Sequence, residues 1–277
     1  MEYSSSRALG LEDKSEKGKK VYTKNELVDQ LTELRKKDWI TLTAHRQDRD
    51  GGIGNTLEDL LGIPENNIPL ADYGEFELKT HHTSSNSLIS LFSCEPEPGS
   101  VIPCLLKDYG WPIGGYGPNE RSLRVDIDAD ACAERGFIAR IDYDLRRVEL
   151  HFDSTKVPND GAYQQWLNEV RKRVGLGDLN PIPYWAFENL EEKVQRKIRN
   201  MVYVSVDTMS RGGRQMVRMA KAQLLLGGSL NALLNGVKEG WLQIEFNART
   251  HHNHGTRFRT WERFWPKLYN STEALTI

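Results

Sequence analysis

The sequence has few cysteines, no long apolar run and almost no net charge, and each absence excludes a class of protein. Three cysteines in 277 residues, Cys94, Cys104 and Cys132, are odd in number and widely spaced, which excludes a disulfide framework and a zinc motif. No apolar run is long enough to span a bilayer, and the N-terminus lacks the apolar segment of a signal peptide. We therefore expect a cytoplasmic protein with reduced thiols and no membrane contact.

The formal net charge of −2 hides an asymmetry along the chain. Residues 191–277 contain 14 Lys and Arg against 7 Asp and Glu, so they carry +7, and the first 190 residues carry −9. A basic C-terminal part is suited to DNA phosphates, and an acidic remainder is suited to a metal site. Ordinary solvated helix faces explain the same asymmetry, so charge alone does not decide between them.

The segment from Asp72 to Lys79, DYGEFELK, has the pattern of an active-site strand in a metal-dependent nuclease. Side chains alternate along a strand, so Glu77 and Lys79 share one face while Phe76 and Leu78 point into a core. A turn at the intervening glycine brings Asp72 towards Glu77. Two adjacent carboxylates bind a divalent cation readily, which would stabilise charge on a phosphodiester while Lys79 helps to activate a water.

An isolated match of this kind is common by chance, and a surface strand with an ion pair across its face also explains it. The preceding segment adds context. Residues Gly51–Gly62 predict a short helix with Asn55 or Thr56 as N-cap, Gly62 as C-cap and one carboxylate, Glu58, near its start. Its expected buried side consists of Leu57, Leu60 and Leu61.

The order Gly-x-x-Leu-Glu58, Asp72, Glu77-Leu-Lys79 resembles the MvaI/BcnI family of type II restriction endonucleases, and also the mismatch-repair nicking enzyme MutH. Both belong to the PD-(D/E)xK nuclease superfamily. This resemblance implies an α/β fold, with a mixed β-sheet flanked by helices and two lobes around a DNA cleft. It implies that Asp72, Glu77 and Lys79 are catalytic and that Glu58 is an accessory acid. The gap between Asp72 and Glu77 is shorter than in MutH, which favours the restriction-enzyme branch.

The same resemblance implies the chemistry and the partners. One or two Mg²⁺ ions would be held by Asp72, Glu77 and a backbone carbonyl, that of Leu78 or Phe76. The enzyme would hydrolyse phosphodiesters of double-stranded DNA in a short GC-rich site of the CCNGG kind, as a monomer that nicks the strands sequentially. A cognate DNA methyltransferase would act in the same system without a stable complex. Two alternatives stay open: a MutH-like repair nicking enzyme that needs partner proteins, and a non-catalytic DNA-binding module.

A second segment, Asn253–Arg259, resembles the DNA-reading region of the MvaI/BcnI family. The alternation of Trp241–Phe246 predicts a strand that leads into it. Three histidines invite a zinc interpretation, but their H-H-x-H spacing on a glycine-containing loop among arginines disfavours it. Arg and His suit the edges of bases instead. The expected DNA-binding residues are His81, Arg211, Arg214, Arg249, His251, His252, Asn253, His254, Arg257 and Arg259.

The remaining patterns predict the organisation of the chain. Residues 1–20 are expected to be a flexible tail, 21–176 a catalytic lobe and 177–277 a DNA-recognition lobe. A capping box at Thr23 begins the first helix. The hairpin over residues 137–152 is expected to extend the central sheet, and Met216–Leu226 is expected to be a helix. The turn Ser210–Arg214 binds phosphate through its amides and guanidinium groups or is simply a turn, and the pattern favours neither.

Overall fold

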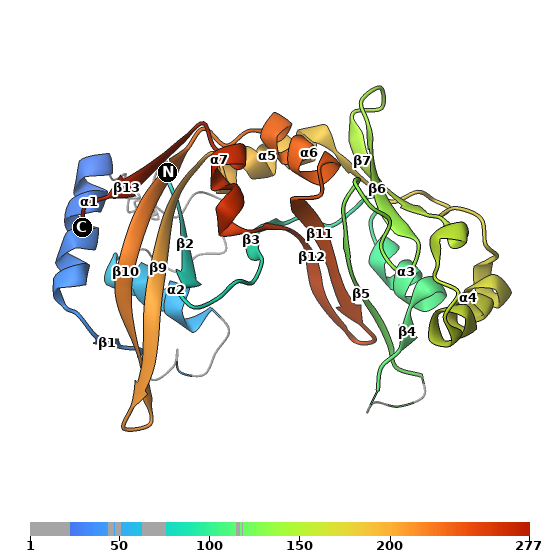
Figure 1. The fold of residues 1–277 in the computed structure, drawn as a ribbon, viewed down its shortest axis with the longest axis horizontal. Coiled ribbons are helices and arrows are strands. Elements are labelled where there is room, and N and C mark those ends of the chain that lie inside the picture. Colours follow the sequence, from blue (N-terminus) through green and yellow to red (C-terminus); the bar gives the residue numbers. More distant parts are fainter. Residues whose placement is uncertain (1–22, 44–46, 48–50, 63–75, 115–116, 118) are drawn as a thin grey trace, which may run out of the picture.

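The computed structural model describes residues 23–43, 47, 51–62, 76–114, 117 and 119–277 (Figure 1). The expected tail and Asp72 lie outside these residues. No helix in the described part of the chain is long and apolar enough to cross a membrane. All three cysteines are free thiols.

The first sheet carries the predicted active-site strand. Its order is β1-β10-β9-β2, and β13 also pairs with β10. The strands are β1 (Ile40–Thr41), β2 (Glu77–His82), β9 (Asn200–Arg211), β10 (Arg214–Leu226) and β13 (Ser271–Leu275). Strand β2 runs parallel to β9. Because β9 and β10 follow residue 176, this sheet combines residues from both sides of the expected lobe boundary.

Two helices, α1 (Lys24–Lys36) and α2 (Gly52–Leu60), pack against one face of the first sheet. The predicted capping box is confirmed, with the Thr23 side chain and Glu26 bonded reciprocally. Helix α2 begins after Gly51, whose φ of 79° favours glycine, so the expected N-cap at Asn55 or Thr56 is wrong. Leu57 and Leu61 are buried as predicted. Leu60 is 37% exposed, so its expected burial is wrong, because it lies on the side of the helix that faces away from the sheet.

The second sheet has the order β3-β12-β11-β5-β4 and supplies the predicted DNA-reading segment. The strands are β3 (Ile89–Ser93), β4 (Trp111–Pro112), β5 (Arg121–Ile127), β11 (Leu242–Arg249) and β12 (His252–Thr260). The segment Asn253–Arg259 is therefore part of a strand, whereas the sequence predicted a loop. In Figure 1 the β9–β10 and β11–β12 hairpins project to the same side of the molecule, away from the helices α5, α6 and α7.

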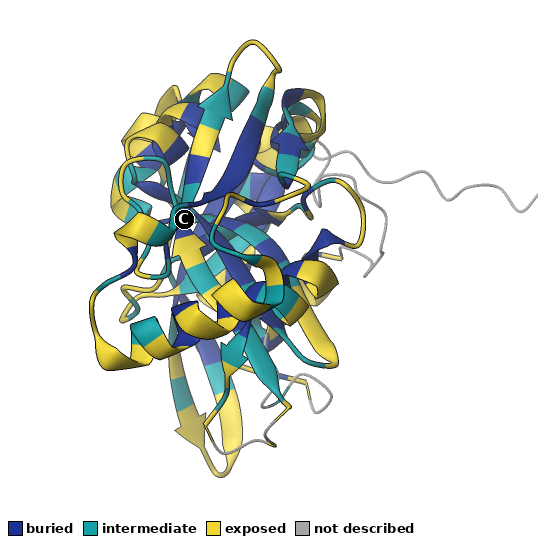
Figure 2. Ribbon diagram, turned by 90° about the vertical axis from the view of Figure 1, so that its right-hand side faces the viewer, coloured by how far each residue is buried: buried dark blue, intermediate teal, exposed yellow. Residues whose placement is uncertain are grey.

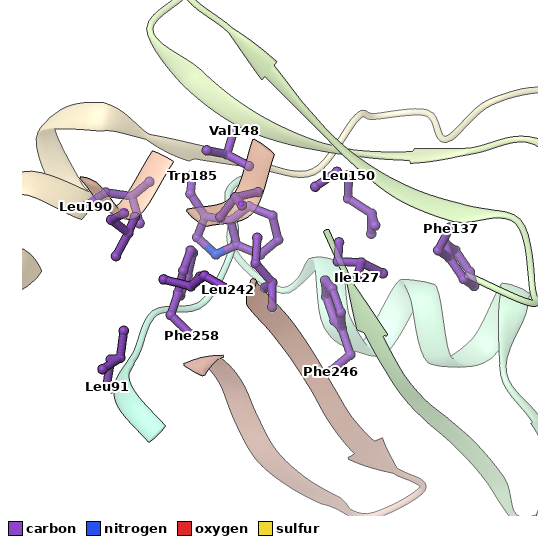
Figure 3. Close-up of a cluster of buried hydrophobic side chains, with 14 of the residues drawn as sticks. Leu91, Ile127, Phe137, Val148, Leu150, Trp185, Leu190, Leu242, Phe246 and Phe258 are labelled. Atoms are coloured by element: carbon purple, nitrogen blue, oxygen red, sulfur yellow. The ribbon is translucent and has the colours of Figure 1, made fainter. Parts of the chain in front are cut away.

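A third sheet covers the apolar face of the second one. It consists of β6 (Phe137–Asp142), β7 (Arg147–Phe152) and β8 (Tyr184–Ala186). Trp185 packs edge-on against Phe258, with ring centroids 5.8 Å apart, and also contacts Phe246 (Figure 3). The second sheet thus has one face in the largest core, and its other face is left for polar side chains.

The remaining helices close the fold around these sheets. They are α3 (Val101–Tyr109), α4 (Gly161–Val174), α5 (Phe187–Lys197), α6 (Leu230–Lys238) and α7 (Trp265–Leu268). Trp265 of α7 packs edge-on against Tyr203 of β9, so this helix covers the face of the first sheet opposite to α1 and α2. Figure 2 shows the resulting pattern, with buried residues in the strands and exposed residues on the outer sides of helices.

Two further predictions, about a helix and about the central sheet, were wrong. Met216–Leu226 forms most of strand β10, because pairing with β9 over its whole length outweighs the helical spacing of its apolar residues. A register shift between Met219 and Lys221 breaks the alternation that would have marked this strand in the sequence. The strands of residues 137–142 and 147–152 are confirmed, but they pair with β8 in their own sheet and do not extend the central one.

Candidate active site and DNA interface

Glu77 opens strand β2 and is almost completely buried, with 2% of its surface exposed. Its Oε1 accepts a hydrogen bond from Lys79 Nζ at 2.8 Å, and its Oε2 accepts one from Lys197 Nζ at 3.0 Å. A buried carboxylate is costly unless cations and hydrogen bonds compensate it, and here two ammonium groups do so. The predicted pairing of Glu77 and Lys79 on one strand face is thus what the structure shows.

An open cleft of about 400 Å³ lies beside this carboxylate. Glu77 and Lys79 form part of its wall, together with basic residues from two other elements and the edge strand β3. The full lining comprises Glu77, Lys79, Ser90, Leu91, Phe92, Ser93, Lys193, Arg196, Lys197 and Arg257. Five of these ten residues are Lys or Arg, so the cleft suits an anionic substrate such as a DNA backbone.

Lys197 is a site residue that the sequence reasoning missed. It ends helix α5, 120 positions from Glu77. The sequence does show a basic helix face, with Lys193 and Lys197 four positions apart. That signal is equally typical of a solvated surface, and only the packing of α5 against the sheet brings this face to Glu77.

Of the other two expected acids, the structure describes only Glu58, because Asp72 lies outside the described residues. Glu58 is on α2, where Gly54 packs so closely that a Cβ there would meet Thr80 Oγ1 at 3.3 Å. Since Leu78 and Thr80 are on the face of β2 opposite to Glu77, helix α2 covers that opposite face. For Glu58 to contact Lys79, one of the two side chains would have to reach around the edge of strand β2.

Glu77 fits a divalent cation by its chemistry. Its carboxylate is a hard oxygen donor beside an open cleft, of the kind that Mg²⁺ accepts, and it already attracts two cationic groups. In the described part of the chain, no three His, Cys, Asp or Glu side chains converge on one point. A complete ligand set would therefore need Asp72 or a backbone carbonyl.

Tyr269 lies close behind Glu77 in the core. Burial, and secondarily the charge of Glu77, raise the pKa of Tyr269 well above its ordinary value, so its hydroxyl stays protonated. That hydroxyl points to the sulfur of Met201, the residue paired with Glu77 across the parallel strands. Behind Glu77 the core thus contains an uncharged tyrosine and a methionine, and neither of them lines the cleft.

The β11–β12 hairpin presents the expected DNA-reading residues at its exposed end. His251 makes the turn with a φ of 61°, and Arg249 pairs with His252. His252 and His254 lie on the same strand face, with Nε2 and Nδ1 3.3 Å apart. Desolvation, followed by the charges of His252 and neighbouring arginines, lowers the pKa of His254 below its ordinary value. Asn253 bonds to the amide of Gly255 and shapes the same end.

Further along the hairpin, Arg257 and Arg259 share a buried partner. Glu245 is 5% exposed and accepts from Arg259 at 2.7 Å, while Arg257 lies 3.8 Å from its second oxygen. Arg259 also donates to the carbonyl of Leu88. Burial and the charge of Glu245 raise the pKa of the adjacent Asp126. Arg259 is therefore held in the sheet, whereas Arg257 reaches the cleft beside Glu77.

The other expected DNA contacts lie on the first sheet. Arg211 and Arg214 face each other across the exposed Gly212-Gly213 turn of the β9–β10 hairpin. The segment forms a turn in the structure, and phosphate binding by it stays a prediction. His81 borders a larger groove of about 780 Å³, which the start of α2 and the strands β9 and β10 also line. Its Nε2 lies 3.2 Å from the Ser85 carbonyl.

Comparisons with known proteins support this interpretation of the fold. The model of the MvaI/BcnI restriction endonuclease family matches residues 28–269. Restriction endonuclease MvaI in complex with its cognate DNA is 20% identical, with a TM-score of 0.72 over 91% of this chain and 98% of that chain. MvaI in the absence of DNA is 21% identical, with a TM-score of 0.50 over 91% and 97%. No curated protein matches the chain.

The mixed α/β fold is that of the MvaI structure, and the family model, together with an acid and a lysine on one strand beside a basic cleft, makes the protein a nuclease. The chain belongs to the MvaI/BcnI restriction endonuclease family and is thus a type II site-specific deoxyribonuclease. The resemblance stated from the sequence is confirmed.

Proposed function

We propose that this enzyme hydrolyses phosphodiester bonds of double-stranded DNA, with Mg²⁺, at a short GC-rich site of the CCNGG kind. The observation that supports this most directly is Glu77, a buried carboxylate joined to Lys79 beside a basic cleft, in a chain of a restriction endonuclease family. It would act as a monomer that nicks one strand at a time, because the described residues contain one such constellation. It would work in the cytoplasm beside a cognate DNA methyltransferase, without a stable complex.

In this proposal Glu77, Asp72 and the backbone carbonyl of Leu78 hold the metal. When bound, the Mg²⁺ ion would stabilise the negative charge that develops on the phosphate and would orient water. Lys79 has its ammonium group 2.8 Å from Glu77 Oε1, and so lies next to the proposed metal ligand. It would position that water or stabilise the charge on the phosphate. Glu58 would support Lys79 or a metal-bound water past the edge of β2.

DNA would lie across the side of the molecule to which both hairpins project (Figure 1). Arg211 and Arg214 would contact phosphates from the β9–β10 hairpin, and His81 would line the adjoining groove. The β11–β12 hairpin would read bases, with Arg249, His251, His252, Asn253 and His254 at its end. Arg257 would join this readout from the cleft, and Arg259 would keep the hairpin in place. In these terms the part before residue 177 would be mainly catalytic and the part after it would mainly read DNA. The exceptions are Lys197 and the strands β9, β10 and β13 on the catalytic side, and β3, β4 and β5 in the sheet that reads DNA.

Digestion of a plasmid of known sequence by the purified protein tests this proposal. We expect discrete fragments with Mg²⁺ and none with a chelator, and mapping of the fragment ends gives the site and the cut position. Nicked circles should appear before linear DNA if the strands are cut sequentially.

The same digestion separates the alternatives. A MutH-like enzyme would cleave weakly until partner proteins were added, so strong cleavage by the protein alone excludes it. A non-catalytic module would retard DNA in a gel and leave it intact with every divalent metal. Random degradation would contradict the site-specific reaction.

A further inference from the structure

Lys197 occupies a position that the nuclease chemistry leaves without a role. Its Nζ lies 3.0 Å from Glu77 Oε2, and its side chain is 26% exposed at the wall of the cleft. Lys79 occupies the other oxygen of the same carboxylate. A divalent cation that binds Glu77 must therefore come close to at least one ammonium group, and like charges at that distance repel strongly in a partly buried site.

Both lysine side chains are 26% exposed, but the two lysines differ in the elements that hold their backbones. Lys79 is two residues from Glu77 on a strand whose register is fixed by Tyr203 of β9, so its backbone cannot shift. Lys197 is the last residue of α5, and its four-carbon side chain reaches Glu77 from the edge of the cleft. A flexible point charge at the end of a helix changes partner without moving the backbone.

The surroundings indicate where the ammonium group would go. The same cleft is lined by three more basic residues, Lys193, Arg196 and Arg257. Their charges would repel the released ammonium group of Lys197 until DNA, a polyanion, enters the cleft and attracts it. We propose that Lys197 is a positioning residue that neutralises Glu77 in the metal-free enzyme and yields it to the metal, whereupon its ammonium group binds the DNA backbone. Metal binding and DNA binding are then coupled through this one side chain. The inference rests on the proposed function of the same site.

The first test measures Mn²⁺ affinity without DNA, by the electron paramagnetic resonance signal of the free ion. Lys197→Met removes the competing ammonium group, so we expect tighter binding by at least about fivefold, the lower end of typical couplings between linked sites. The matched control is Lys193→Met. Lys193 is one helical turn earlier in the same cleft wall and, among the described residues, makes no hydrogen bond to Glu77. In Lys193→Met the Mn²⁺ affinity should change by less than about twofold, because a charge without a direct contact to Glu77 contributes little.

The second readout is the metal dependence of DNA affinity, measured by fluorescence anisotropy with Ca²⁺ in place of Mg²⁺. In the unmodified enzyme Ca²⁺ should tighten DNA binding in two ways. It neutralises the negative charge of Glu77, which repels DNA, and it releases Lys197 to bind the DNA backbone. In Lys197→Met the Ca²⁺-dependent gain in DNA affinity should be about fivefold smaller, and in Lys193→Met it should persist.

A third measurement needs no variant and stands even if Lys197→Met fails to fold. Acetylation of each lysine in the unmodified enzyme is followed by mass spectrometry. Ca²⁺ should raise the labelling of Lys197 and leave that of Lys193 unchanged, and DNA should then protect Lys197. If the extent of Lys197 labelling is the same with and without Ca²⁺, the proposal is overturned.

Failure of the inference and failure of the proposed function give different results. If Glu77→Gln leaves Mn²⁺ affinity unchanged, the metal does not bind at this carboxylate and the proposed active site fails. If Glu77→Gln abolishes Mn²⁺ binding while Lys197→Met behaves like Lys193→Met, the site stands and only the role of Lys197 is refuted.

Discussion

Two buried glutamates, Glu77 in the first sheet and Glu245 in the second, each hold a pair of basic side chains, but the pairs differ in chemistry. Glu77 binds two lysines, at 2.8 and 3.0 Å, beside an open cleft. Glu245 binds Arg259 at 2.7 Å and lies 3.8 Å from Arg257. Lysine is a compact charge on a flexible stem, whereas the guanidinium of arginine is planar and fixes its partners' geometry.

The difference teaches what each region is built to do. A carboxylate that must accept a metal and a substrate benefits from a partner that can leave, which is the role we propose for Lys197. A strand that must present side chains in a constant register to DNA benefits from partners that stay, and Arg259 is tied both to Glu245 and to the carbonyl of Leu88. The sequence does not distinguish the two regions, because in both of them it shows only acidic residues near basic ones.

The largest expected effect is on the reaction at the first glutamate. Lys79→Met should lower kcat by about 10²- to 10⁴-fold, the usual contribution of a positioned acid or base, and Glu77→Gln should lower it at least as much. DNA binding, measured by gel retardation, should persist in both. Glu273→Gln, at an exposed acid of the same sheet, is the control and should cut normally. An unchanged cutting rate in either active-site variant would refute the assignment.

The second effect is on stability at the other glutamate. Arg259→Met leaves the buried Glu245 with a distant partner only, and breaking such a pair costs about 3–5 kcal/mol in the free energy of unfolding. Arg257→Met should cost about 1 kcal/mol or less, because its contact is long and partly solvated. Urea denaturation measures both. Restoration of stability when Glu245→Gln is combined with Arg259→Met would show that the unpaired charge is the cause. Equal losses in the two arginine variants would contradict the distinction drawn between them.

A third effect concerns sequence discrimination. Arg257→Ala should reduce the preference for the cognate site over a site with one base pair changed by about 1–3 kcal/mol, the value of one lost bidentate contact to guanine. The ratio of kcat/KM on the two sites measures it. Arg214→Ala, at the other hairpin, should weaken binding to both sites alike. If Arg257→Ala leaves the ratio unaltered, Arg257 does not read a base.

The smallest effect is that of pH at the end of the recognition hairpin. Desolvation and nearby positive charge lower the pKa of His254 below 6.5, so in the free protein it is neutral at pH 7. As the pH falls through this lowered pKa, protonation of His254 adds positive charge, and non-specific DNA affinity should rise. The same protonation weakens the fold, because the unfolded chain binds that proton more readily. His254→Gln should flatten the pH dependence of binding in an anisotropy titration. An unchanged slope in that variant would exclude His254 as its source.

Local patterns were reliable where one short segment carries the whole signal. The capping box at Thr23, the strands of residues 137–142 and 147–152, and the shared face of Glu77 and Lys79 all depend on residues a few positions apart. The prediction failed at Met216–Leu226, because a long hairpin with a register shift has helical spacing in its sequence. Helix α2 starts earlier than its capping residues indicate, because Gly51 makes the turn through its backbone.

The sequence by itself indicated the MvaI/BcnI family, through the resemblance of the motifs at Glu58, Asp72, Glu77-Leu-Lys79 and Asn253–Arg259, and the family model confirms it. Strand geometry alone placed Glu77 and Lys79 on one face, because they lie two residues apart. The tertiary structure alone decided which cations surround them. Lys197 reaches Glu77 from 120 positions away, and Arg259 is fixed by a glutamate of the neighbouring strand. The physical reason is that the period of a helix or strand relates only neighbours, whereas the compensation of a buried charge depends on whatever the packed elements bring to it.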